Sequence, residues 1–345
     1  MGIRIQQELA DQLSNKNTLP VINSHDSWSP LEEVWLGDVY PADWYSHLSC
    51  EVQDIFCQLT EITQQDLSSI EKTLQGFGIT VCRPVYDSID HYIDNNGQLK
   101  KPQITPRDNF VVIGNQLIGH EDCFRPWQHT VDQYLGDARC SVQPSDNRCI
   151  HGANVVRVGR DIIVDRDITD YEYRGEWPDY RVRVVENGGH MDGCFAILRP
   201  GLLIANHYFD DYQRTFPGWE IIMLDNPTYN AAPSKGYFQQ YPVYNGKFWN
   251  TGTETNKSFN QHIVQHALDW VGCYTETFFE LNCLVIDESN VVMLAENSHI
   301  EKELASRGIT VHWVPFRARS FWDGAMHCLT VDIRRRSSLQ DYFSV

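Results

Sequence analysis

Short runs of apolar residues recur along the chain, each about the length of a β-strand. Several come in pairs that are separated by glycine, asparagine or aspartate, which is the pattern of a β-hairpin. The clearest hairpin is predicted over residues 283–294, where a polar turn separates two aliphatic runs. The predicted strands cover residues 33–37, 110–114, 155–159, 195–198, 202–205, 283–286 and 291–294.

Amphipathic helices are predicted between these hairpins. Residues 66–77 carry apolar side chains at spacings of three and four, ending at Phe77, and are followed by glycine and another strand-like run. The same order of helix, glycine and strand occurs at residues 300–311 and, more weakly, at residues 208–222. One such module cannot bury its own apolar face. The repetition therefore predicts several modules that share a centre.

Residues 225–260 follow neither the helical nor the strand period and are rich in asparagine, proline, tyrosine, glycine and threonine. This composition predicts a long irregular loop. Long loops in compact domains often act as lids or subunit contacts, and a plain surface excursion fits this stretch equally well.

Length and charge narrow the classes of protein that fit this pattern. A chain of 345 residues is long enough for one large domain or two ordinary ones. Its 46 acidic and 28 basic side chains give a formal net charge of -18, which argues against nucleic acid or an anionic membrane as the main partner. An acidic field favours cationic small molecules instead.

The N-terminal segment, residues 1–20, is polar and has neither an apolar signal core nor the arginine-rich character of a transit peptide. No run approaches the roughly 18 apolar residues that are needed to span a membrane. The ten cysteines are scattered without a Cys-x-x-Cys pair, which favours reduced thiols over disulfides or a zinc site. We therefore expect a soluble, cytoplasmic protein.

Four residues from distant parts of the chain have side chains suited to attack on a guanidinium carbon, namely Cys328, His190, Asp108 and Asp192. A guanidinium is planar, delocalised and charged in neutral water, so its central carbon is a poor electrophile. Carboxylates that hold its nitrogens leave the face open to a thiolate, and an imidazole can protonate the departing amine. This chemistry needs one cysteine, one histidine and at least two acids.

Each of these residues also has an ordinary structural interpretation. A lone cysteine is most often a small buried hydrophobe. His190 and Asp192 point to the same side if they start a strand, but the Asn-Gly-Gly at residues 187–189 is equally typical of a turn. Asp108 opens a predicted strand, where an ion pair with Arg107 is the alternative.

Segments in order along nearly the whole chain resemble the amidinotransferase family, which includes glycine amidinotransferase, inosamine-phosphate amidinotransferases and enzymes of cyanobacterial toxin pathways. The N-terminal signature of the family is similar to residues 28–37, and its cysteine segment is similar to residues 327–335. The other similar segments are Pro106-Arg107-Asp108 with Gly114-Asn115, Gly152-Ala153-Asn154 with Arg157 and Gly159-Arg160-Asp161, His190-Met191-Asp192 with Arg199-Pro200-Gly201, Asn282, and Phe316-Arg317.

The resemblance implies a single catalytic domain over residues 21–345, an α/β propeller of five modules around a pseudo-fivefold axis, known as the pentein fold. It implies a covalent amidino-cysteine at Cys328, with His190 as general acid/base and two carboxylates, Asp108 and Asp192, as clamps on the guanidinium. It implies no metal and no organic cofactor, and it leaves a homodimer open. The residues expected to bind substrate are Arg107, Asn154, Asn282, Arg317 and Asp323.

The chain departs from the family at three places. His151 stands where relatives have the carboxylate that orients the catalytic histidine, and a neutral imidazole stabilises an imidazolium less than an anion does. Phe209 stands where glycine amidinotransferases have the arginine that takes the carboxylate of the donor; either Arg214 or Arg317 replaces it, or the substrate lacks that carboxylate. Asp323 adds an acid where the family has glycine.

We therefore expect an amidinotransferase with ping-pong kinetics, a guanidino donor, L-arginine above all, and an amine acceptor. The first alternative is a hydrolase of the same superfamily, in which water replaces the amine. The second is a non-catalytic relative that keeps the fold as a binding protein, because His151 and Phe209 depart from the family pattern.

Overall fold

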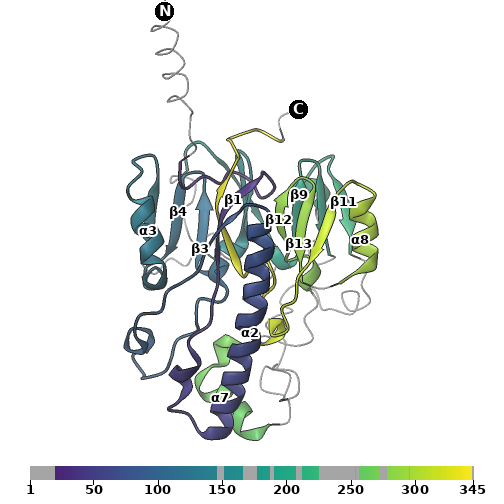
Figure 1. The fold of residues 1–345 in the computed structure, drawn as a ribbon. Helices are drawn as coiled ribbons and strands as arrows, with labels where there is room; N and C mark the ends of the chain where they lie inside the picture. The colour runs from purple at the N-terminus through teal and green to yellow at the C-terminus, as the bar shows by residue number, and fades with distance from the viewer. Residues whose placement is uncertain are drawn as a thin grey trace, which may run out of the picture.

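The computed structural model describes residues 20–145, 151–165, 177–186, 190–206, 212–224, 253, 256–271, 278–294 and 296–343. These residues form five small mixed sheets of three strands each (Figure 1). The predicted fold class, a pentein propeller of five α/β modules, is confirmed.

All five sheets follow one pairing rule. The middle strand pairs antiparallel with one neighbour and parallel with the other, so each module is a hairpin plus one returning strand. Four of the sheets consist of β3 (Phe110–Ile113), β4 (Gln116–His120) and β5 (Ser141–Ser145); β6 (Val155–Val158), β7 (Asp161–Asp165) and β8 (Arg181–Val185); β9 (Phe195–Arg199), β10 (Leu202–Ala205) and β11 (Glu220–Met223); and β12 (Leu284–Asp287), β13 (Asn290–Met293) and β14 (Thr310–Trp313).

The fifth sheet is assembled from both ends of the described chain. Its middle strand, β1 (Leu31–Leu36), pairs parallel with β2 (Thr80–Cys82) and antiparallel with β15 (Thr330–Arg335). Strand β15 therefore takes the place that the first hairpin strand has in the other modules. Strand β15 was not among the strands predicted from the apolar runs in the sequence.

The predicted order of helix, glycine and strand is confirmed where the structure describes it. Helix α2 (Cys50–Gly76), α4 (Tyr212–Thr215) and α8 (Ser298–Ala305) each precede a glycine with φ between 75° and 78° and then the parallel third strand. A side chain would be strained in this left-handed conformation, so glycine is the residue that suits the turn. Residues 208–211 of the weak third copy lie outside the described part.

Two helix predictions were wrong in detail. Helix α2 begins sixteen residues earlier than residue 66, and Phe77 is its partly exposed C-terminal cap and not part of the buried stripe. Residues 257–260 of the predicted irregular loop belong to α7 (Lys257–His266), which Asn256 caps by accepting a hydrogen bond from the backbone N–H of Phe259 at 2.9 Å. Residues 225–250 of that loop lie outside the described part.

The helices lie around and beyond the sheets (Figure 1). Long α2 extends away from the sheets, and α7 packs against its far half. The remaining α-helices are α3 (Gln128–Tyr134) and α9 (Arg319–Trp322). Short 3-10 helices are η1 (Ala42–Tyr45), η2 (Ile89–Tyr92), η3 (Pro106–Asp108), η4 (Glu121–Cys123), η5 (Arg125–Trp127), η6 (Gly152–Asn154), η9 (Met191–Gly193), η10 (Leu268–Trp270) and η11 (Phe278–Glu280). No helix in the described residues is long and apolar enough to cross a bilayer.

A buried ion cluster joins the modules. The carboxylate of Asp332 in β15 is 2.5 Å from the Arg107 guanidinium, 2.6 Å from that of Arg157 and 2.7 Å from that of Arg335. All four residues are at most 1 % exposed. These arginines hold the pKa of Asp332 well below its usual range, against the upward effect of burial.

Candidate active site

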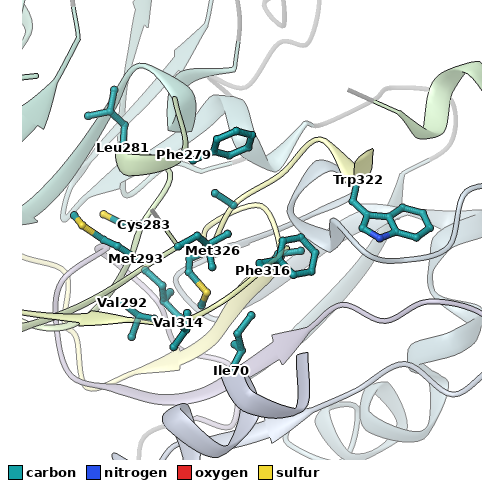
Figure 2. Close-up of a cluster of buried hydrophobic side chains, with 14 of the residues drawn as sticks. Ile70, Phe279, Leu281, Cys283, Val292, Met293, Val314, Phe316, Trp322 and Met326 are labelled. Carbon is teal, nitrogen blue, oxygen red and sulfur yellow. The ribbon is translucent and has the colours of Figure 1, made fainter. Parts of the chain in front are cut away.

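The cysteine expected to be the nucleophile lies in a rigid segment. Cys328 sits between α9 and β15, is 3 % exposed, and is preceded by Met326, which is fully buried. Figure 2 shows Met326, Phe316 and Trp322 in one apolar cluster with Ile70 of α2 and with Val292 and Met293 of β13. Side chains in such close-packed interiors have few alternative positions. The backbone that carries the thiol is therefore fixed by packing.

Glycine at position 324 allows the close approach that this segment needs. A β-carbon there would come within 2.8 Å of the Thr105 side chain and 3.2 Å of the Cys328 β-carbon. The backbone N–H of Arg107 also donates to the Cys328 carbonyl at 3.3 Å. These contacts place the segment beside η3, which carries Asp108.

The thiol lies between a donor and an acceptor. The Asn282 side-chain amide donates to the Cys328 sulfur at 2.9 Å, and the thiol points at the Asp192 carboxylate oxygen Oδ2 at 3.3 Å. Asn282 is completely buried and Asp192 is 5 % exposed. The predicted cysteine and one of its two predicted clamps are thus in direct contact.

Asp192 and its short helix are held by residues from two other segments of the chain. Asp192 lies in η9, whose first backbone N–H, that of Met191, donates to the Asn154 side-chain oxygen at 2.9 Å. Its oxygen Oδ2 lies 2.8 Å from His327 Nδ1, and because an ionised carboxylate only accepts, that nitrogen carries the proton. The second oxygen, Oδ1, has no hydrogen-bond partner among the described residues. One oxygen of this buried carboxylate therefore accepts no hydrogen bond within the described part of the chain.

Burial and the charges around the sulfur determine which groups of the site are protonated. Burial, then the carboxylates of Asp192 and Asp108, raise the pKa of Cys328 well above its ordinary value. Burial alone would raise the pKa of Asp192, but the hydrogen bond from His327 brings it below its usual value. Burial and the nearby Arg107 guanidinium lower the pKa of His327. At neutral pH the thiol is protonated, the carboxylate ionised and His327 neutral.

The second predicted clamp and the two predicted histidines form the outer part of the site. Asp108 ends η3, and its Oδ1 lies 4.0 Å from His190 Nδ1 and has no hydrogen-bond partner in the described part of the chain. The rings of His151 and His190 have centroids 6.2 Å apart. Loss of solvent around its ring and the neighbouring His190 lower the pKa of His151. His151 therefore faces His190 as a neutral imidazole.

An open cavity of about 820 Å³ reaches this outer part of the site. Asp108, His120 and His151 line it on one side, and residues of α7 and η10, including Leu268 and Trp270, line it on the other. Ligand cavities of several hundred Å³ accommodate small organic molecules. Among the described residues, no group of three or more histidine, cysteine or acidic side chains has a metal-binding arrangement.

The structure shows where several of the predicted residues lie. The fully buried guanidinium of Arg107 binds Asp332 and donates to the Thr330 carbonyl at 3.0 Å. It is also not paired with Asp108, which was the structural alternative. His190 and Asp192 do not start a strand: His190 caps η9 and is exposed while Asp192 is buried.

The other residues that were predicted to bind substrate have contacts within the protein or end a helix. Arg317 reaches the Asp66 carboxylate of α2 at 2.8 Å, so its guanidinium is occupied and does not replace the missing carboxylate anchor. The Asn282 side chain donates to the Cys328 sulfur, and the Asn154 side chain accepts from the Met191 backbone N–H. Asp323 ends α9 with φ of 52°, in the left-handed region. Phe209, at the family's carboxylate-binding position, lies outside the described residues.

His327 was not predicted as a site residue, although its side chain touches Asp192. Its position next to Cys328 was the available signal. Adjacent residues in an extended segment point in opposite directions, so adjacency alone does not indicate that two side chains contact one carboxylate. In the structure this segment is a turn, closed by a hydrogen bond from the Leu329 N–H to the Ala325 carbonyl at 2.9 Å, and both side chains reach the same oxygen.

Comparison with known proteins gives a consistent result. Mitochondrial glycine amidinotransferase from Xenopus tropicalis is 23% identical over 402 residues, which span 93% of this chain and 84% of that protein. An L-arginine:L-lysine amidinotransferase from Pseudomonas savastanoi pv. phaseolicola is 22% identical over 94% of this chain and 97% of its own length. An amidinotransferase of the saxitoxin pathway from Microseira wollei superposes with a TM-score of 0.67 at 21% identity, covering 94% of this chain and all of that one. No family model matches the sequence.

Proposed function

Because this chain is a homologue of the amidinotransferases along nearly its whole length, we propose that it moves an amidino group from a guanidino donor to an amine by way of a covalent adduct on Cys328. The observation that carries this proposal is the position of the thiol, 3.3 Å from the Asp192 carboxylate and in the field of Asp108. Both carboxylates have an oxygen without a partner in the described residues. A planar cation with several N–H donors matches these acceptors.

Binding of the donor is proposed to activate the thiol. The two carboxylates that raise the pKa of Cys328 would be neutralised by a guanidinium bound between them. The thiolate then forms beside the carbon it attacks and not in the empty site. This order protects a cysteine that would otherwise be alkylated or oxidised at neutral pH.

The first half-reaction replaces one bond at the guanidinium carbon. The thiol proton leaves along its hydrogen bond to Asp192 and is taken by His190, whose ring lies within the field of that carboxylate. A sulfur–carbon bond forms, the bond from carbon to the substituted nitrogen breaks, and His190 returns the proton to the departing amine. The products are a free amine and a cationic amidino-cysteine.

The second half-reaction runs the same steps in reverse with a different amine. A neutral acceptor nitrogen attacks the amidino carbon, the new carbon–nitrogen bond forms and the sulfur–carbon bond breaks. His190 takes the surplus proton of the acceptor and returns it to the sulfur. The open cavity next to Asp108 and His151 offers a path by which the first amine leaves and the second enters.

L-arginine is the donor that we propose, as in the name of the Pseudomonas relative. Arg317 is occupied by Asp66, and Phe209 replaces the arginine that binds the donor's α-carboxylate in glycine amidinotransferases. We therefore expect agmatine, which lacks the carboxylate, to be less than about 100-fold worse than arginine in kcat/KM. A larger difference would mean that another cation binds this carboxylate.

The covalent step is tested by mass spectrometry of the intact protein mixed with arginine. Wild type should gain one amidino group, located at Cys328 by peptide mapping, and Cys328→Ala should gain none and lose turnover by at least about 10⁴-fold. Cys283→Ala is the matched control, since Cys283 is also buried but contacts no acid in the described site. Turnover by Cys328→Ala near the wild-type rate would rule out the mechanism, and release of citrulline or ammonia without any guanidinylated amine would identify a hydrolase.

A further inference from the structure

We infer that Asn282 is a catalytic residue that fixes the side-chain conformation of Cys328 and stabilises its thiolate. Nothing in the sequence or in the relatives' names assigns it this role, and on sequence it was expected to bind substrate. The inference rests on the proposed role of Cys328. It adds that the nucleophile has a dedicated hydrogen-bond donor, separate from the carboxylates that bind the guanidinium.

Three polar groups of Asn282 bind the segment that carries the nucleophile. Its side-chain oxygen accepts from the Cys328 backbone N–H at 3.0 Å, and its side-chain amide donates to the sulfur at 2.9 Å. Its backbone carbonyl accepts from the His327 N–H at 3.3 Å. A carboxamide bound to both the backbone and the sulfur of one residue permits one arrangement of that cysteine.

The surroundings of Asn282 keep it in place. It precedes β12 in the segment Leu281-Asn282-Cys283, and all three residues are at most 3 % exposed. The Cys283 backbone N–H donates to the Leu281 carbonyl at 2.8 Å, which closes a tight turn around Asn282. Figure 2 shows the side chains of Leu281 and Cys283 at the edge of the apolar cluster that also contains Met326. With no exposed surface, Asn282 is out of reach of a substrate in this structure.

Ionisation of the sulfur changes its two contacts in opposite ways. A neutral thiol donates to Asp192 and accepts from Asn282. Once the proton has left, the contact with Asp192 becomes a repulsion between two anions, whereas the bond from Asn282 becomes charge-assisted and stronger. Asn282 is thus the contact that favours the reactive form. The same bond acts on the sulfur as leaving group when the adduct is resolved.

The other charged groups near the sulfur do not provide this stabilisation. Asp192 and Asp108 oppose ionisation of the thiol. His327 is neutral and donates its Nδ1–H hydrogen bond to Asp192. The Arg107 guanidinium is bound to Asp332. His190 lies beside Asp108. Within the described residues, the Asn282 amide is therefore the one donor that lies within hydrogen-bond distance of the sulfur.

The test uses the near-isosteric change Asn282→Asp, which keeps an oxygen for the Cys328 N–H and replaces the amide donor by an acceptor. The pH dependence of Cys328 alkylation by iodoacetamide, followed by peptide mass spectrometry without any donor, reports ionisation of this thiol alone. We expect the alkylation midpoint to move up by at least one pH unit, so that alkylation below the midpoint slows about tenfold or more. Asn23→Asp is the control, because Asn23 is a buried amide that donates to the Arg335 and Ser337 carbonyls instead.

A second variant keeps the test decisive if Asn282→Asp does not fold. Asn282→Ala removes both side-chain contacts without adding charge, and it should also raise the midpoint and slow alkylation. An alkylation profile identical to wild type in either folded variant would overturn the inference. The proposed function fails separately: if wild-type Cys328 forms no amidino adduct with arginine, that proposal is wrong, while the alkylation result still decides the role of Asn282.

Discussion

Two buried aspartates, Asp332 in β15 and Asp192 in η9, show how the surroundings of a carboxylate decide what it does. Asp332 accepts hydrogen bonds from three buried arginines, and both of its oxygens are occupied. Asp192 is equally sheltered, but it contacts only a neutral histidine and a thiol, and one of its oxygens is unpaired in the described residues. The Asp332 carboxylate is fully paired with arginines of the protein and has a structural role. The Asp192 carboxylate has one oxygen that could still accept hydrogen bonds from a bound cation.

Arg107 connects the two carboxylates. Its guanidinium is bound to Asp332, and its charge also lowers the pKa of His327, which in turn holds Asp192. The sequence motif Pro-Arg-Asp at residues 106–108 therefore serves both regions. Its arginine is part of the ion cluster, and its aspartate faces the site.

The largest effect is expected from Asp332→Asn, which leaves three buried arginines without an anion. Breaking a buried pair typically costs about 3–5 kcal/mol in the free energy of unfolding. The pKa of Asp332 is depressed, so its contribution is present above the unfolded-state pKa of about 3.9 and is lost as pH falls through the lower folded value. Urea unfolding should show a lower free energy of unfolding for the variant than for wild type at both pH 7 and pH 4. Unchanged stability at pH 7 would contradict the structural role of Asp332.

Asp192→Asn should separate two proposed roles of this carboxylate, binding of the guanidinium and suppression of thiol ionisation. We expect kcat/KM to fall by about 10²–10³-fold, because an amide cannot stabilise the guanidinium in the transition state as an anion does. The thiol should meanwhile become easier to alkylate at neutral pH, because Asp192 raises the pKa of Cys328. A variant with slower alkylation and lost activity would instead mean that Asp192 serves as the base that ionises the thiol in the empty enzyme.

His327 offers a smaller and more selective test, since it acts through Asp192. His327→Ala leaves the carboxylate without its donor and should lower kcat by roughly 10–100-fold. His327→Asn places an amide N–H near the position of Nδ1 and should recover most of that loss. The ratio of the two variants is the measurement. Equal activity in both would show that the hydrogen bond at 2.8 Å does not matter for turnover.

The smallest effect is expected from His151→Asp, which restores the acid that relatives carry. An anion beside His190 stabilises its protonated form, so activity should stay the same or rise, by about tenfold at most. Products from arginine and a panel of primary amines should keep the wild-type ratio of transfer to hydrolysis. A clear loss of transfer would place His151 in contact with the substrate.

More of the fold than of the site could be predicted from the sequence, because the spacing of apolar residues shows which face of a helix or strand is buried. The hairpins and the repeated helix, glycine and strand were predicted because their buried residues are apolar. Strand β15 was missed because it carries Asp332 and Arg335 into the core, where charges conceal the apolar alternation. The exposed edge strand β8, with its two arginines, was missed for a similar reason.

For the site, residue types were predictable and their partners were not. The chemistry of a guanidinium requires a cysteine and acids, and this pointed to Cys328 and Asp192. The partner of an arginine or asparagine depends on which segments the ring of modules brings together. Arg107 meets Asp332 across 225 residues, and Asn282 meets Cys328 across 46. Neither pairing leaves a trace in local sequence.

The pairing of β1 with β15 has a consequence for how the enzyme is made. Leu31 and Arg335 lie opposite each other although some 300 residues separate them. During synthesis β1 leaves the ribosome long before β15, so the sheet that carries the nucleophile segment cannot close until almost every other module has emerged. Such distant pairings form late. Cys328, the nucleophile that we propose, therefore reaches its place beside Asp192 only after the other modules have been synthesised.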